Sequence, residues 1–103
     1  GLNALLQAKA QEEDVVLSAI CAAPLVLGGL GLLQGKQATC YPGFETELGT
    51  AEYVSDLRVV RAGRMITAPG MGCAQQFGLA LVELLRGAAE ADRIRRSIMT
   101  PEA

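Results

Sequence analysis

The chain has 103 residues and contains no histidine, no tryptophan and only three cysteines. Without histidine there is no imidazole base, and three cysteines with no Cys-x-x-Cys pair form neither a zinc site nor a disulfide framework. We therefore expect no metal and no cofactor. Unpaired cysteines also favour a reducing compartment, which makes a cytoplasmic location the expectation.

Long basic runs and long uninterrupted apolar runs are missing as well. Eleven acidic residues outnumber nine basic ones, and the arginines are scattered instead of forming the basic stripe that a phosphate backbone requires. The most apolar stretch, residues 15–33, is broken by Ser18, Cys21, Pro24 and several glycines, which argues against a membrane span. Neither nucleic acid nor membrane is expected as a partner, and the length allows a single domain.

The stretch that organises the chain is an apolar run that leads directly into Cys21. Residues 15–20 show no alternation of polar and apolar side chains, which predicts a buried strand covered on both faces. Pro24 is tolerated in a first helical turn, so we expect a helix from about Ala22 to Leu33. A thiol at such a helix start lies among free backbone N–H groups, although a buried, inert cysteine is the alternative.

The other elements follow from periodicity and turn residues. We expect an amphipathic helix over 2–13 that lies on a sheet, and a β-hairpin whose two-residue turn is Ala62-Gly63. The remaining expectations are strands at 37–40 and 53–54, a helical turn at 45–49, and helices at 73–86 and 88–99 with Gly87 as a cap. These elements indicate an α/β layer sandwich with too few parallel strands to flank the run at 15–20.

Three motifs give the chain a family resemblance. The segment Ser18–Pro24, the segment Ala38–Glu45 and the turn Gly70–Gly72 resemble the ThiJ/PfpI superfamily, and the similarity runs from about residue 2 to residue 99. The nearest branch holds a parkinsonism-associated deglycase and chaperone, together with bacterial proteins named for thiazole monophosphate biosynthesis. The resemblance implies a flavodoxin-like three-layer α/β sandwich with a mostly parallel sheet, about twice as long as this chain and homodimeric.

By this resemblance, residues 1–103 form the C-terminal part of a single domain. The N-terminal segment, which carries several strands, a glutamate that hydrogen-bonds the reactive cysteine and a Gly-Gly turn, is then either a separate fragment or missing. That segment and a second copy of the protein are the expected partners.

The resemblance also implies a site centred on Cys21 as the reactive residue. The backbone N–H groups of Ala22 and Ala23 would bind an oxyanion, and the expected pocket residues are Tyr41, Pro42, Gly70 and Gly72. Tyr41 stands where many members have histidine, and a phenol is too weak a base at neutral pH to replace the imidazole. Residues 68–73 also depart from the usual Ser-Arg-Gly-Pro-Gly-Thr, losing an arginine that would recognise anions.

The other two cysteines invite simpler interpretations. Cys40 ends a strand and Cys73 begins a helix, so both are expected to be packing residues, and Cys73 is also a candidate resolving thiol for oxidised Cys21. Three functions stay open at this point. They are a redox-responsive or protein-protecting role, a cysteine-dependent glyoxalase or deglycase acting on reactive dicarbonyls, and a purely structural interaction domain.

Overall fold

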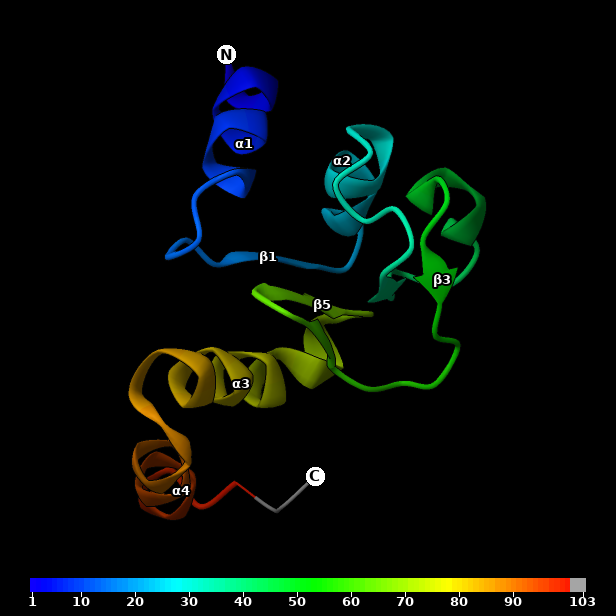
Figure 1. The fold of residues 1–103 in the computed structure, drawn as a ribbon. Helices are drawn as coiled ribbons and strands as arrows, with labels where there is room; N and C mark the ends of the chain where they lie inside the picture. Colours follow the sequence, from blue (N-terminus) through cyan, green and yellow to red (C-terminus); the bar gives the residue numbers. More distant parts are fainter. Residues whose placement is uncertain (101–103) are drawn as a thin grey trace.

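The computed structural model describes residues 1–100 and arranges them in three layers. Figure 1 shows α1 and α2 on one side of the strands β1 and β5, and α3 and α4 on the other side. The predicted α/β layer sandwich is therefore confirmed. The elements in chain order are α1 (Leu2–Ala10), β1 (Leu17–Ile20), α2 (Pro24–Gly29), β2 (Gln37–Ala38), η1 (Glu45–Leu48), β3 (Glu52–Tyr53), β4 (Val60–Ala62), β5 (Met65–Ala68), η2 (Met71–Cys73), α3 (Ala74–Arg86) and α4 (Ala88–Ser97).

The main sheet has the strand order β1-β5-β4. β1 pairs in parallel with β5, from Leu17 opposite Met65 to Ile20 opposite Ala68, and β4 pairs antiparallel with β5. A separate parallel pair joins β2 to β3. Among residues 1–100, β1 therefore has a strand neighbour on one edge only, and Ser18 in the middle of it is exposed.

The core lies between β1, α2 and the segments around β2 and η1. Its buried side chains are Ala19, Leu27, Leu33, Ala38, Cys40 and Leu48. α2 approaches η1 so closely that a Cβ placed on Gly28 would lie 2.6 Å from the Leu48 Cα atom. Gly28 therefore allows α2 to pack closely against η1. The helix also ends at Gly29, earlier than the expected end near Leu33.

Two expectations about the first helix are wrong. α1 ends at Ala10 instead of residue 13, and none of its residues is buried. Leu2 and Leu5 remain 62% and 54% exposed, and only Leu6 packs against the core. The physical reason is the small sheet: α1 lies above the N-terminal end of the edge strand β1, where no further strand offers a surface to cover (Figure 1).

The hairpin is present, but its turn is displaced by one residue. Ala62 pairs with Met65, so the two-residue turn is Gly63-Arg64, and Gly63 adopts a positive φ of 63° that suits glycine. The helices α3 and α4 form as expected around Gly87, which also has a positive φ. Within residues 1–100, no helix combines the length and the apolar character needed to cross a bilayer.

Candidate active-site cysteine and its surroundings

Cys21 occupies a strained turn at the end of β1. Its φ is +66°, and within residues 1–100 only one other non-glycine residue, Met99, has a positive φ. An L-residue in this left-handed region costs about 1–2 kcal/mol, because its Cβ crowds the carbonyl oxygen. Such strain persists only where the surroundings impose it, and it is concentrated at functional sites. The side chain is half-buried, so reagents can reach it.

Three hydrogen bonds hold this elbow in place. The Cys21 N–H donates to the Ala68 carbonyl at 2.9 Å, and the Tyr41 N–H donates to the Cys21 carbonyl at 2.7 Å. The segment that carries Tyr41 is itself tied to β5, because the buried Thr39 N–H donates to Thr67 Oγ1 at 3.0 Å. Both backbone groups of Cys21 are thus fixed by neighbouring segments, which accounts for its unusual φ.

The two backbone donors expected after Cys21 differ in availability. The Ala23 N–H donates to the Ile20 carbonyl at 3.2 Å and is engaged in the turn. The Ala22 N–H has no backbone acceptor within residues 1–100, and Ala22 is exposed. α2 begins only at Pro24 and has six residues, so the helix dipole near the thiol is weaker than a helix to Leu33 would give. Ala22 is the donor that remains free.

Tyr41 lies beside the elbow, and Pro42 follows it in the chain. The backbone of Tyr41 contacts Cys21 directly through the hydrogen bond described above, while the residue as a whole is 49% exposed. The Tyr41 ring packs against Phe44 with 6.3 Å between the ring centroids and 48° between the ring planes. Pro42 is exposed next to it. The structure therefore brings this segment to Cys21, and its role as a pocket wall stays a prediction.

Cys40 has the opposite environment. It is fully buried in the core, and its thiol donates to the Tyr41 carbonyl at 3.4 Å. Burial, with smaller contributions from the carboxylates of Glu45 and Glu47, raises the pKa of the Cys40 thiol. Because the thiolate is the reactive form, this cysteine is held in its inert state. The interpretation of Cys40 as a packing residue agrees with this environment.

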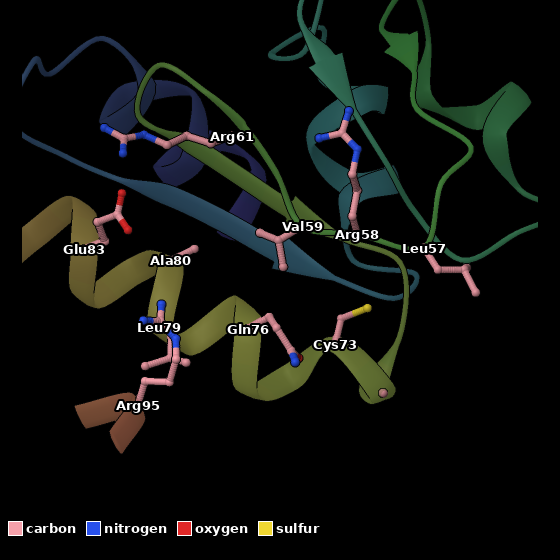
Figure 2. Close-up of a pocket in the computed structure, with 11 residues that line it drawn as sticks. Leu57, Arg58, Val59, Arg61, Cys73, Gln76, Leu79, Ala80, Glu83 and Arg95 are labelled. Atoms are coloured by element: carbon pink, nitrogen blue, oxygen red, sulfur yellow. The ribbon is translucent and has the colours of Figure 1, made fainter. Parts of the chain in front are cut away.

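Cys73 and Gly72 line a different part of the molecule. They lie at one end of a groove of about 690 Å³ between α3 and the segment that leads into β4 (Figure 2). Neither Cys21 nor Tyr41 lines this groove, so it is separate from the elbow. Gly70, in extended conformation and half-buried just before η2, does not line it either. The role of Cys73 as a resolving thiol stays a prediction.

Sequence reasoning missed the charged groups of this groove, Arg61 and Glu83 among them. The one available signal was the spacing of Cys73, Gln76, Ala80 and Glu83, which places these residues on one face of a helix. All three cysteines of the chain are free. Within residues 1–100, no group of three or more histidine, cysteine, aspartate or glutamate side chains is arranged to hold a metal ion.

Comparison with protein families and relatives extends this description. The family model described as DJ-1/PfpI matches residues 3–84. Protein dj-1beta of Drosophila melanogaster is 36% identical over 85 residues, which cover 82% of this chain and 46% of that protein. Glutathione-independent glyoxalase DJR-1.2 of Caenorhabditis elegans is 32% identical over 85 residues, which cover 81% of this chain and 45% of that protein.

Solved structures show the same relation. The crystal structure of Drosophila melanogaster DJ-1beta superposes with a TM-score of 0.88 at 32% identity, covering 98% of this chain and 54% of that one. The oxidised DJ-1 of Toxoplasma gondii gives a TM-score of 0.87 at 29% identity, again with 98% and 54% coverage. The flavodoxin-like fold is therefore shared. This chain spans about half the length of these relatives.

Proposed function

We propose that this chain, which belongs to the DJ-1/PfpI family, carries the reactive cysteine of a redox-responsive, protein-protecting protein. Cys21 is that cysteine. The observation that carries the proposal is its φ of +66°, held by hydrogen bonds from both of its backbone groups. A strained conformation imposed on an accessible thiol is typical of a functional site, whereas a packing cysteine has no need of it.

The proposed reaction consumes peroxide. The Cys21 thiolate attacks one oxygen of the peroxide, the O–O bond breaks, and a sulfenate and water are produced. A second equivalent of peroxide oxidises the sulfenate to a sulfinate and releases another water. We expect the N–H of Ala22, which has no backbone acceptor within residues 1–100, to donate to an oxygen on the Cys21 sulfur. Cys40 stays reduced, because it is buried and its pKa is raised.

An enzymatic role is the second candidate, favoured by the similarity to a protein named as a glyoxalase. In this mechanism the Cys21 thiol adds to the aldehyde of a reactive dicarbonyl, and an acid/base group moves the proton that the product requires. The chain has no histidine to serve as that group. We infer that a glutamate outside this chain supplies it, as the family resemblance implies.

The same inference extends to partners. The unpaired edge of β1 and the exposed leucines of α1 are surfaces that additional strands and helices of the family domain would cover. We propose that an N-terminal segment pairs with β1 and that the complete protein forms a homodimer. Its three free cysteines suit a reducing compartment, such as the cytoplasm.

The test treats the full natural protein, its Cys21→Ser variant and a matched Cys73→Ser control with peroxide and, separately, with methylglyoxal. Mass spectrometry should find sulfinate on Cys21 in the peroxide-treated wild-type and control proteins. The redox-responsive role requires this oxidation and does not require turnover of methylglyoxal. Methylglyoxal turnover that disappears in Cys21→Ser but persists in the Cys73→Ser control would indicate the enzymatic role instead. An unmodified Cys21 without any turnover would contradict both roles and favour a structural domain.

A further inference from the structure

The groove that contains Cys73 has the shape of a binding site. One wall is a single face of α3, where Gln76, Ala80 and Glu83 follow Cys73 at helical spacing (Figure 2). Ten helical residues rise about 15 Å, so the groove is long enough for a small organic molecule. The facing wall comes from the segment that leads into β4 and from β4 itself. Its volume, about 690 Å³, lies within the range of ordinary ligand pockets.

The lining of the groove is mainly apolar along its length. Leu57 and Val59 contribute from the β4 side, and Leu79 and Ala80 contribute from α3. Leu57 is 76% exposed, which leaves a large apolar side chain at the mouth of the groove without cover among residues 1–100. An apolar ring or chain inserted here would remove this surface from water.

The charges around the groove are mostly positive and incompletely neutralised. Arg58 pairs with Asp56 at 3.2 Å. Arg61 takes part in none of the ion pairs within residues 1–100, and its Nε donates to the Gly63 carbonyl at a long 3.4 Å. Arg95 pairs with Asp92 at 3.1 Å, but Asp92 also pairs with Arg96, so one carboxylate serves two guanidinium groups. Among residues 1–100, Glu83 supplies the one carboxylate that lines the groove, and it lies at the Arg61 end (Figure 2).

We propose that this groove is a second binding site, separate from Cys21, for a small organic acid with an apolar ring or chain. The apolar body lies against Val59 and Ala80, and the carboxylate accepts hydrogen bonds from the guanidinium group of Arg61. A carboxylate bound in this way gives Arg61 a charged partner in addition to its long hydrogen bond to the Gly63 carbonyl. Cys73 lies at the opposite end, where its alkylation rate reports whether the groove is filled.

The experiment compares 2-naphthoate with its neutral isostere, 2-naphthamide, on the full natural protein. Each compound is added at about 1 mM, and iodoacetamide labelling of every cysteine is followed by peptide mass spectrometry. Naphthoate should slow the labelling of Cys73 about fivefold and leave that of Cys21 unchanged, while naphthamide should have little effect. Equal protection by both compounds, protection of Cys21 as well, or no protection at all would overturn the proposal.

A pair of arginine variants locates the site without relying on the thiol. Arg61→Gln removes the charge in the groove, and Arg93→Gln removes a similarly exposed charge that does not line it. Calorimetric titration with 2-naphthoate should show about tenfold weaker binding in Arg61→Gln and unchanged binding in Arg93→Gln. Equal affinities in the two variants would exclude the groove as the site.

Discussion

Cys21 and Cys40 lie in adjacent segments of the molecule and have opposite properties. The residue after Cys40 donates its N–H to the carbonyl of Cys21, so the two cysteines are separated by one hydrogen bond and one residue. Cys21 is half-buried in a left-handed turn, whereas Cys40 is fully buried with a raised pKa. We therefore expect the reactivity of the two thiols to depend on backbone conformation and access to solvent, and their closeness in the fold should not make them alike.

The two environments depend on each other. Residues 39–41 contain the buried Cys40 and also the Tyr41 N–H that donates to the Cys21 carbonyl. This segment is anchored to β5 by the hydrogen bond from the Thr39 N–H to Thr67 Oγ1. A change that loosens this segment should therefore make Cys40 more accessible and the conformation of Cys21 less fixed. We expect three substitutions to disturb these two cysteine environments, each with a smaller effect on stability than the one before.

Replacing Gly28 with alanine should have the largest effect. The new Cβ would lie 2.6–2.8 Å from backbone atoms of Leu48, so η1 has to move away from α2 and uncover the core around Cys40. We expect the free energy of unfolding to fall by about 3 kcal/mol, measured by urea denaturation. Gly29→Ala is the matched control, because its Cβ meets nothing within 4 Å. Equal losses in the two variants would contradict the close packing of α2 on η1.

Replacing Thr67 with valine should have an intermediate effect. It keeps the shape of the side chain but removes the oxygen that accepts the hydrogen bond from the Thr39 N–H. A buried N–H left without a partner costs about 2 kcal/mol, and Cys40 should become labelled faster by iodoacetamide. Thr46→Val, at an exposed position in η1, is the control and should change neither quantity. Unchanged stability and unchanged Cys40 labelling in Thr67→Val would show that this hydrogen bond is not needed to hold the segment in place.

The smallest effect should come from relieving the strain at Cys21 itself. Cys21→Gly and Cys21→Ala both remove the thiol, but only glycine adopts a φ of +66° without strain. The glycine variant should therefore be more stable than the alanine variant by about 1 kcal/mol in thermal or urea unfolding. An alanine variant as stable as the glycine variant would show that the turn relaxes without cost.

Much of the site is predictable from the sequence, because the signals there are local. The apolar run before Cys21 and the proline three residues after it predict a strand, a turn and a helix, and the structure has all three. The position of the hairpin turn is harder to predict. Ala62-Gly63 and Gly63-Arg64 both contain a glycine, and only the pairing of Ala62 with Met65 selects the second.

The failures come from contacts between distant segments. The leucines of α1 have helical spacing, but whether they are covered depends on how many strands lie beneath them, which the pattern does not contain. The φ of Cys21 is fixed by hydrogen bonds with Ala68 and Tyr41, which lie far from it in the sequence. The groove along α3 similarly requires the β4 segment to lie opposite Cys73.

The central claim is that the fold separates a reactive thiol at Cys21 from an inert one at Cys40. Its most direct test measures the iodoacetamide labelling rates of both cysteines in one sample of the full natural protein, from about pH 7 to about pH 9. In the native state Cys21 should react at least about tenfold faster throughout, because burial keeps Cys40 protonated and covered, and the two rates should converge in denaturant. Equal rates in the native state would contradict the account.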